Sequence, residues 1–333
     1  MRDVHLSPAK LRAALAHFRR LKVLVVGDLM LDEFIYGRVS RISPEAPVPV
    51  VHVEKETTYP GGAANVARNL AALGIHTELA GGIGHDESGN KLLSLLKHGK
   101  IGTSGIARLA SFPTIVKTRV LARQQQVVRV DREEPGRLTA RDRSTILQKT
   151  LRLLPKCDAL ILEDYGKGIF DQTFVDHLLD AARKHGVPST VDPNVHNPLD
   201  WRGATLVKPN RLEAFGALGL PDSHNPEDWI SVGEELLVNW SCQHLLLTLG
   251  EHGMILFQPG HKPHRIPSRA REVYDVSGAG DTAISLLAAG LGAGLSGLVS
   301  AELANLAAGI VVGKLGTATV GPSEILEASR RHG

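Results

Sequence analysis

Residues 275–282 combine two features that phosphoryl-transfer chemistry needs: a glycine-containing turn and a carboxylate directly after it. The run reads Asp-Val-Ser-Gly-Ala-Gly-Asp-Thr and leads into an apolar, alanine-rich stretch that is expected to be helical. Glycine lets the backbone approach a ligand closely, and the first N–H groups of a helix have no partner within the helix. Because the helix dipole adds positive potential there, Gly278, Ala279 and Gly280 are predicted to form an anion hole.

Asp281 is the residue that gives this turn a specific chemistry. A carboxylate would repel a bound phosphate unless the reaction needs a base at that point. Its predicted role is to accept the proton of a hydroxyl group that attacks a phosphoryl group. The alternative is that Asp281 only caps a helix and the glycines only form a tight turn, and these eight residues alone do not separate the two interpretations.

The composition is that of a globular protein with a sizeable core. Of 333 residues, 43% are hydrophobic and 22% are charged, and the formal net charge is only +3. These values predict no nucleic-acid partner and are compatible with one large α/β domain over residues 1–333. The two cysteines, Cys157 and Cys242, fit a cytoplasmic location and argue against structural zinc.

Residues 282–301 carry no charge over twenty positions, a length that would suit a membrane span. The glycines clustered from Gly290 to Gly294 instead predict two buried helices with a joint between them. We therefore expect no membrane-spanning segment.

From about residue 137 onward, segments with helical periodicity alternate with short apolar runs. Such runs are typical of strands buried on both faces, and residues 22–26 form another one near the N-terminus. The alternation predicts βαβ units, and therefore a doubly wound, mostly parallel sheet with helices on both faces. Ligands of such sheets bind beyond the carboxyl ends of the strands. The polar residues at those ends are Asp28, Glu163, Asp164, Asp192, Lys208, Asn210 and Thr248.

Residues 34–59 and 112–131 do not follow this alternation. Both are rich in strand-forming residues, and Pro44, Pro47 and Pro49 confine the first to a sheet edge or irregular extended structure. We expect the two segments to pair into a small β-sheet lid that excludes water from the site. Since exposed strand edges are usually covered, the prediction includes a homodimer joined through these segments.

A second glycine turn opens a helix between the two lid segments. Residues 60–74 begin Pro-Gly-Gly-Ala-Ala-Asn and close at Gly74, which is suited to a C-cap. Asn65 stands in the first turn of this helix and can both donate to and accept from a sugar hydroxyl. Its alternative role is helix capping.

Three motifs in this order resemble the ribokinase-like, or phosphofructokinase-B type, carbohydrate kinases over essentially the whole chain. They are residues 61–67 (Gly-Gly-Ala-Ala-Asn-Val-Ala), residues 210–213 (Asn-Arg-Leu-Glu) and residues 275–282. The resemblance implies the ribokinase-like fold and an ATP-dependent kinase in which Asp281 is the general base. It also implies Mg²⁺ associated with Glu213, Asn210 and Asp192.

The resemblance assigns the remaining site residues as well. The nucleotide-side residues are Lys208, Asn210, Thr248, Gly250, Gly253, Ser277 and Asn305. The sugar-side residues are Asp28, Gly61, Gly62, Asn65 and Asp164. Some relatives also bind a monovalent cation such as K⁺ near the positions of Asp275 and Ser277.

Within this family, the runs around Asp28, residues 40–50 and Asn65 are similar to those of kinases acting on D-glycero-β-D-manno-heptose 7-phosphate in lipopolysaccharide core biosynthesis. The implied reaction phosphorylates the anomeric (C1) hydroxyl with ATP and gives the 1,7-bisphosphate. Such kinases are fused to an adenylyltransferase domain in some bacteria, and here the resemblance implies a separate adenylyltransferase. A sugar phosphate calls for cationic groups near the lid, for which arginine is well shaped. The candidates are Arg41, Lys117, Arg119 and Arg123.

The sequence distinguishes some alternative functions from this one more clearly than others. A kinase for fructose 6-phosphate, ribose or a nucleoside would share Asp281 and the glycine turns, and a catalytically silent sugar-binding regulator could keep them too. A dinucleotide-dependent oxidoreductase requires G-x-G-x-x-G after the first strand, which residues 26–30 lack. A P-loop NTPase requires glycine directly before its lysine, whereas Asn90 precedes Lys91.

Overall fold

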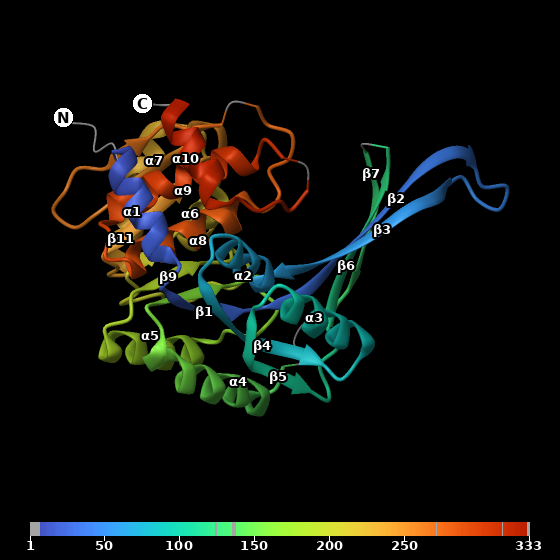
Figure 1. The fold of residues 1–333 in the computed structure, drawn as a ribbon, viewed down its shortest axis with the longest axis horizontal. Helices are drawn as coiled ribbons and strands as arrows, with labels where there is room; N and C mark the ends of the chain where they lie inside the picture. Colours follow the sequence, from blue (N-terminus) through green and yellow to red (C-terminus); the bar gives the residue numbers. More distant parts are fainter. Residues whose placement is uncertain (1–6, 124, 135–137, 271, 315, 332–333) are drawn as a thin grey trace.

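A nine-stranded sheet forms the frame of the molecule (Figure 1). The computed structural model describes residues 7–123, 125–134, 138–270, 272–314 and 316–331. The strands, in spatial order, are β13 (His264–Ile266), β12 (Met254–Phe257), β11 (His244–Thr248), β10 (Leu206–Val207), β9 (Ser189–Asp192), β8 (Ala159–Glu163), β1 (Lys22–Gly27), β4 (His76–Gly84) and β5 (Gly102–Leu109). Strands β5 to β11 in this order pair in parallel, and β12 and β13 add an antiparallel edge. The predicted doubly wound, mostly parallel sheet is confirmed.

Helices cover both faces of this sheet. They are α1 (Pro8–Phe18), α2 (Ala63–Ala72), α3 (Glu87–His98), α4 (Ala140–Leu153), α5 (Gln172–His185), α6 (Arg211–Ala217), α7 (Pro226–Asn239), α8 (Ala279–Gly292), α9 (Gly297–Val311) and α10 (Pro322–Arg331). Two 3₁₀ turns, Leu154–Lys156 and Gly250–His252, are also present. Figure 1 shows α8, α9 and α10 above the sheet and α4 and α5 below it.

Strand β1 shows why helices pack on both faces of the sheet. Successive side chains of a strand point to opposite faces. Val23 and Val25 join the core that contains α2, α8 and α9, whereas Leu24 and Val26 join the core that contains α4, α5 and α7. All four side chains are fully buried, so the apolar run read from the sequence reflects packing on two sides.

Helices α8 and α9 pack against each other, as the glycine cluster predicted. Gly290 allows their close approach, because a Cβ there would overlap the Ser300 side chain. Within the described ranges, no helix is both long and apolar enough to cross a membrane.

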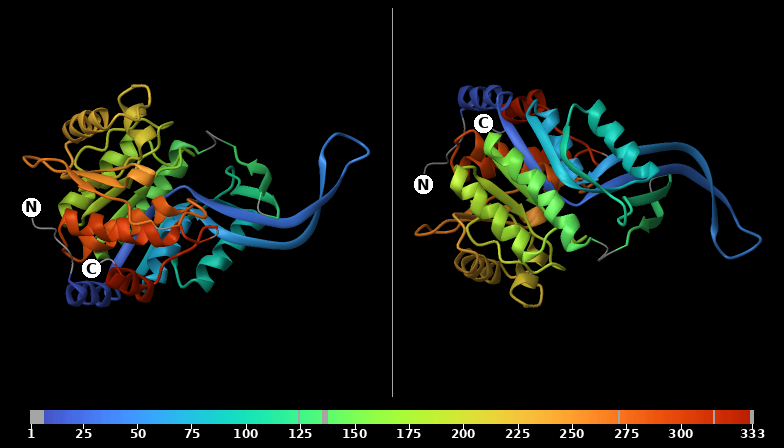
Figure 2. Two further views of the ribbon diagram at one scale, coloured as in Figure 1. Left: turned by 90° about the horizontal axis from the view of Figure 1, so that it is seen from above. Right: turned by 90° about the horizontal axis from the view of Figure 1, so that it is seen from below.

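A four-stranded sheet projects from this body, and we call it the lid sheet (Figures 1 and 2). In spatial order its strands are β3 (Pro49–Gly62), β2 (Leu29–Ile42), β6 (Ile115–Ala122) and β7 (Gln125–Arg132). Strands β2 and β3 form a long antiparallel hairpin, and β2 pairs with β6 in parallel. The two segments predicted as a lid therefore do pair with each other.

The lid strands run deeper into the body than the predicted segment 34–59. Strand β2 begins at Leu29, one residue after Asp28, and β3 ends at Gly62, directly before α2. Pro49 lies in β3, which is an edge strand and so tolerates a missing N–H donor, whereas Pro44 and Pro47 lie in the connection between β2 and β3. Of the predicted domain and lid ranges, residues 1–6, 124, 135–137, 271, 315 and 332–333 lie outside the described residues.

Candidate active site

A cavity of about 560 Å³ lies at the carboxyl ends of β8, β9, β10 and β11, where the topology of the sheet predicts a site. Its volume is within the range of small-molecule pockets. Of the predicted site residues, it is lined by Asp164, Asp192, Lys208, Asn210, Glu213, Thr248, Gly250, Gly280 and Asp281. The fold therefore brings the carboxylates, the lysine and the glycine turn to one place.

The turn before α8 has the geometry that an anion hole needs. Gly278 adopts a φ of +79°, a conformation that favours glycine, and α8 starts at the next residue. No side chain caps this end of the helix. The Ala279 N–H donates to the Val276 carbonyl at 3.2 Å, and the N–H groups that follow it in the first turn have no carbonyl partner within the helix. At Gly280 an added Cβ would lie 3.8 Å from Lys208 Nζ. A phosphate bound at this turn would therefore meet both backbone N–H groups and an ammonium group.

Asp281 is only 9% exposed, and both of its carboxylate oxygens accept hydrogen bonds. Asn65 Nδ2 donates to Oδ2 at 2.5 Å, and the Tyr165 hydroxyl donates to Oδ1 at 3.0 Å. Burial raises the pKa of Asp281 above its usual value, and the charge of Asp192 adds to this, although the bonds from Asn65 and Tyr165 oppose it. A fixed carboxylate with a raised pKa is suited to general-base chemistry.

The start of α2 holds the Asp281 carboxylate in place. The Asn65 amide oxygen accepts a hydrogen bond from Arg68 Nη1 at 2.9 Å, so the amide bridges Arg68 and Asp281. The two glycines before the helix serve close packing: a Cβ on Gly61 would overlap the Asp32 carboxylate, and Gly62 has a φ of +59°. The sequence predicts that Asn65, Gly61 and Gly62 contact the sugar, and this contact stays a prediction.

Lys208 is the buried cation of the cavity. Its Nζ lies 2.8 Å from Asp192 Oδ2, and both side chains are largely buried. Burial alone would lower the pKa of Lys208, but the charges of Asp192 and Glu213 outweigh it and raise that pKa above its usual value. The raised pKa keeps Lys208 in its charged form, which is the form that could pair with a phosphate.

The predicted Mg²⁺ element, Asn210 and Glu213, forms a capping box at the start of α6. Asn210 Oδ1 accepts from the Glu213 N–H at 3.0 Å, and Glu213 Oε2 accepts from the Asn210 N–H at 2.7 Å. This arrangement explains the spacing of the motif locally. It also orients the Glu213 carboxylate, which lines the cavity.

The carboxylates around Lys208 have the donor chemistry that Mg²⁺ requires. Glu163 is buried and its Oε2 has no hydrogen-bond partner. Burial, followed by the charge of Asp192, raises the pKa of Glu163 and brings that of Glu213 to about 7, and a cation would relieve both effects. In the part of the chain that the structure describes, no three His, Cys, Asp or Glu side chains could enclose a metal. These residues fit Mg²⁺ bound through one or two carboxylates, water and substrate phosphates.

Asp28 and Asp164 are buried and shape the loop that follows β8. Asp28 Oδ2 accepts from the N–H groups of Tyr165 and Lys167 at 3.0 and 3.1 Å, and Asp164 Oδ1 accepts from the Gly166 N–H at 2.7 Å. Burial raises the pKa of Asp28 to about 6 and, together with the charge of Asp28, that of Asp164 to about 7. Their observed role is to fix this loop, and their contact with a sugar stays a prediction.

The predicted nucleotide-side residues that do not line the cavity make other contacts nearby. Gly253 has a φ of +81° and packs so closely on the backbone after β13 that a Cβ would overlap it. Asn305 Nδ2 donates to the Pro267 carbonyl at 2.7 Å. The exposed Ser277 donates its N–H to Asp275 Oδ1 at 2.9 Å. ATP contacts of these residues, and a K⁺ site at Asp275 and Ser277, stay predictions.

The predicted phosphate-binding cations do not gather at the cavity. Arg41 is exposed and pairs with Val50 near the tip of the β2–β3 hairpin, which Figure 1 shows far from the body. Arg123 is exposed in the turn between β6 and β7. Arg119 forms an ion pair with Asp32. Within one chain, Arg41 and Arg123 are therefore too distal to serve this cavity, because the strands that carry them run outward.

Three residues without a predicted role belong to the site. Glu163 lines the cavity with a buried carboxylate, Tyr165 lines it and donates its hydroxyl to Asp281, and Arg68 donates to Asn65. Glu163 and Tyr165 lie at or just beyond the end of β8, where the sites of such sheets are expected. Arg68 stands three positions after Asn65, which places both on one helix face.

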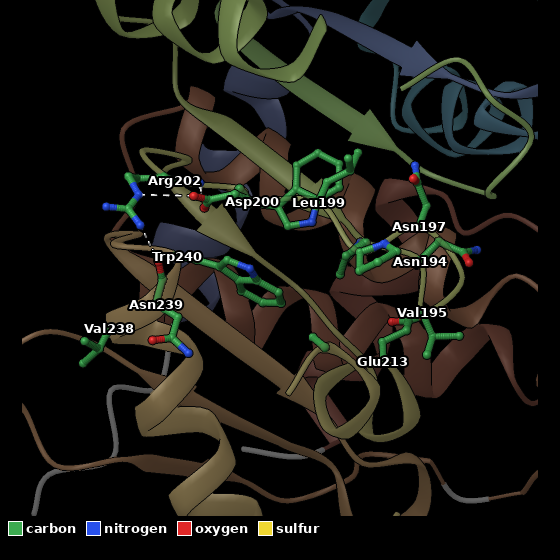
Figure 3. Close-up of a pocket in the computed structure, with 14 residues that line it drawn as sticks. Asn194, Val195, Asn197, Leu199, Asp200, Arg202, Glu213, Val238, Asn239 and Trp240 are labelled. Atoms are coloured by element: carbon green, nitrogen blue, oxygen red, sulfur yellow. Dashed lines mark hydrogen bonds and ion pairs between the residues drawn. The ribbon is translucent and has the colours of Figure 1, made fainter. Parts of the chain in front are cut away.

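A second cavity, of about 460 Å³, shares Glu213 with the first (Figure 3). Its wall is residues 193–202 together with the end of α7. Figure 3 shows the Arg202 side chain joined to Asp200 and to the backbone of Asn239. This cavity is lined by neither Asp281 nor Lys208, so the chemistry is assigned to the first one.

Comparisons with known proteins agree with this geometry. A family model described as pfkB family carbohydrate kinase matches residues 20–324. The chain is 46% identical to the Bifunctional protein HldE of Magnetococcus marinus over 318 residues and 46% identical to that of Sodalis glossinidius over 320 residues. These alignments cover 95% and 96% of this chain, which spans 65% of the length of either relative.

Two solved structures show the same fold at low sequence identity. Arabidopsis thaliana ribokinase, complexed with ribose and ATP, is 19% identical, with a TM-score of 0.72 and coverage of 93% of this chain and 99% of that one. Phosphofructokinase-2 from Escherichia coli, in complex with potassium, is 18% identical, with a TM-score of 0.73 and coverage of 93% and 98%. The fold is therefore ribokinase-like.

Proposed function

Because this chain belongs to the pfkB family of carbohydrate kinases, we propose that it transfers the γ-phosphoryl group of ATP to the anomeric (C1) hydroxyl of D-glycero-β-D-manno-heptose 7-phosphate. The motifs shared with heptose-phosphate kinases and the relatives named Bifunctional protein HldE support this substrate. The observation that carries the proposal is the buried carboxylate of Asp281, held by two hydrogen bonds at the start of α8.

In the proposed reaction the sugar hydroxyl oxygen attacks the γ-phosphorus, and the bond from that phosphorus to the bridging oxygen of ADP breaks. Asp281 accepts the hydroxyl proton, and the electron pair of the broken bond leaves with ADP. The N–H groups of residues 278–280 and the Lys208 ammonium stabilise negative charge on the transferring group. Bound Mg²⁺, held at Glu213 with Asn210 or Asp192 directly or through water, would neutralise further phosphate charge.

The proposal includes a homodimer joined through the lid sheet. All eight residues of β7 are exposed, and Val127, Val128 and Val130 on this strand are among the exposed large apolar side chains. Strand β7 is also an edge of the lid sheet. Because open edges and exposed apolar patches favour association, a second lid sheet is the partner that would cover both.

The test is a coupled ADP-release assay on the wild-type chain and the Asp281→Asn variant. D-glycero-β-D-manno-heptose 7-phosphate, fructose 6-phosphate and ribose are compared as acceptors. We expect preferential turnover of the heptose phosphate and a loss of about 10²- to 10⁴-fold in kcat in the variant, because the base is gone while its shape is kept. Asp180→Asn, at an exposed position that pairs with Arg183, serves as the matched control.

The outcomes separate the parts of this proposal. Preferential turnover of another sugar that still requires Asp281 would keep the kinase mechanism and reject the heptose phosphate. Full activity of Asp281→Asn would contradict the assignment of the base. If the wild-type chain turned over no sugar, a catalytically silent sugar-binding regulator would become the better description.

A further inference from the structure

Two lysines from different parts of the molecule converge on one carboxylate between the lid sheet and the body. Lys117, on β6, donates from Nζ to Glu133 Oε2 at 3.2 Å, and Lys167, in the loop after β8, donates from Nζ to Glu133 Oε1 at 2.8 Å. The three side chains are 12%, 19% and 20% exposed, in the order Lys117, Lys167, Glu133. Glu133 thus bridges two partly buried ammonium groups. Its carboxylate compensates part of the hydration that both groups lose.

The loop after β8 carries both a donor to Asp281 and one of the two lysines. Tyr165 donates its hydroxyl to Asp281, and the backbone N–H groups of Tyr165 and Lys167 both bond to Asp28. The Cα atoms of residues two positions apart are separated by at most about 7 Å. The backbone therefore brings Lys167 close to the residue that holds the Asp281 carboxylate.

Lys117 lies on the face of the lid sheet that is turned toward the base. The strand registers place Lys117 beside Asp32, and Asp32 beside Tyr59, and cross-strand partners share a face. Arg68 of α2 stacks over the Tyr59 ring at 5.1 Å and donates to Asn65, the residue that holds the base. The lid face that carries Lys117 is therefore packed against the elements of the site.

We propose that Lys117 and Lys167 bind the phosphate group of a sugar-phosphate substrate, and that Glu133 occupies their ammonium groups until the substrate arrives. This inference rests on the proposed function and names the residues that select a phosphorylated sugar. A phosphate dianion has more charge and more acceptor oxygens than a carboxylate, so it satisfies two ammonium groups better. A neutral sugar has no group that could displace Glu133.

The neighbouring charges are arranged so that the lysines can exchange partners. Lys117 also contacts Asp131 at 3.1 Å, but Asp131 is held independently by Arg129 at 2.9 Å. Burial would raise the pKa of Glu133, yet the hydrogen bond from Lys167 and the charge of Lys117 hold that pKa below its usual value. Glu133 is therefore an ionised competitor for the phosphate at neutral pH.

The test compares a sugar phosphate with its dephosphorylated counterpart in steady-state kinetics. For Lys167→Met we expect the KM for D-glycero-β-D-manno-heptose 7-phosphate to rise about 10- to 100-fold, the cost of one charge-assisted hydrogen bond, with the KM for the unphosphorylated heptose unchanged. Lys117→Met is expected to act in the same direction. Lys91→Met is the matched control, since this lysine pairs with Glu33 on the opposite face of the lid sheet, and it is expected to change neither KM.

Glu133→Gln gives a second test with the opposite sign. Removing the competing charge is expected to lower the KM for the heptose phosphate about 3- to 10-fold, a gain that a folding defect cannot produce. An increase in that KM in Glu133→Gln, or an equal loss on phosphorylated and free sugar in Lys167→Met, would overturn this inference and leave the proposed function standing. Wild-type preference for a different sugar phosphate would instead reject the heptose, and the same variants would then be compared on that sugar.

Discussion

Asp281, the proposed base, is held by donors from two separate parts of the molecule. Asn65 reaches Asp281 from α2, and Tyr165 reaches it from the loop after β8. Each donor occupies a different carboxylate oxygen, so the carboxylate plane is fixed by both. A change in either donor should therefore alter both the orientation of the base and its proton affinity.

Tyr165→Phe tests this dependence, because it removes the hydrogen bond to Asp281 and keeps the ring. That bond lowers the pKa of Asp281, so its loss is expected to raise the pKa and to move the acidic limb of the kcat/KM profile to higher pH. We also expect kcat at neutral pH to fall about 10-fold, since the carboxylate is less well oriented. The charged groups that face Asp281 stay the same in both proteins: Glu163, Asp192, Lys208 and Arg68.

The measurement is the pH dependence of kcat/KM for the wild-type chain and Tyr165→Phe. Tyr274→Phe is the control, because the Tyr274 hydroxyl bonds to Glu272 on the surface. An acidic limb that did not move in Tyr165→Phe would show that Tyr165 only packs.

The role of a single residue could be predicted where the evidence for it lies in neighbouring positions of the sequence. Asp281 and its glycines form one short motif, so their chemistry could be inferred from neighbouring positions. Tyr165 lies 116 positions away from Asp281, and tyrosine occurs both at the surface and in the interior of proteins. Only the fold shows that its hydroxyl reaches the base. The lid cations illustrate the same limit, because charge alone did not show that Arg41 lies near the tip of the β2–β3 hairpin, far from the cavity.

At the scale of elements, the end of β1 is a tightly packed junction of the central sheet. A Cβ on Gly27 would overlap the Glu163 carbonyl oxygen of β8 and would lie 2.9 Å from the Cβ of Ala63 on α2. The strand that leads to Asp28 therefore has no room for a side chain at this point.

Gly27→Ala is expected to lower the free energy of unfolding by about 1–3 kcal/mol, the usual cost of overpacking. Gly99→Ala is the control: Gly99 has a φ of −73°, and an added Cβ would meet its nearest atoms at 3.5 Å. Urea unfolding of the two variants and the wild-type chain measures the difference. Equal midpoints for Gly27→Ala and Gly99→Ala would contradict the packing argument.

Elements with long and regular patterns could be predicted from the sequence, and those defined by their neighbours could not. The helical periodicity predicts helices over residues 141–154, 171–185 and 228–239. Helices α4, α5 and α7 lie within two residues of these ranges. Strands β4, β5, β12 and β13 and helix α3 had no assignment. Strand β4 reads His-Thr-Glu-Leu-Ala-Gly-Gly-Ile-Gly, which lacks an unbroken apolar run, and it is a strand because β1 and β5 pair with it on both sides.

At the scale of the whole molecule, the proposed dimer predicts a change of mass. Val128 and Val130 alternate along β7 and so share one face. We expect light scattering at micromolar concentration to give a mass of about twice the 35.8 kDa monomer mass for the wild-type chain. The double variant Val128→Lys, Val130→Lys is expected to have the mass of a monomer. Buried lysines would cost more than the apolar contacts they replace.

Val238→Lys is the matched control, since Val238 is an exposed valine on the body at the end of α7. It is expected to leave the mass unchanged. A wild-type monomer under these conditions, or a double variant that remained dimeric, would reject the lid sheet as the interface.

The way the lid sheet joins the body limits how such a kinase can be re-engineered. Strand β2 starts right after Asp28, and β3 runs directly into the helix that carries Asn65. There is no linker at either junction, so a lid borrowed from another sugar kinase cannot be exchanged as a cassette. A slip of one residue at a graft point would turn each following side chain to the opposite face and would displace Asp28 or Asn65 as well. A change to the lid that alters substrate choice is therefore expected to alter the catalytic residues as well.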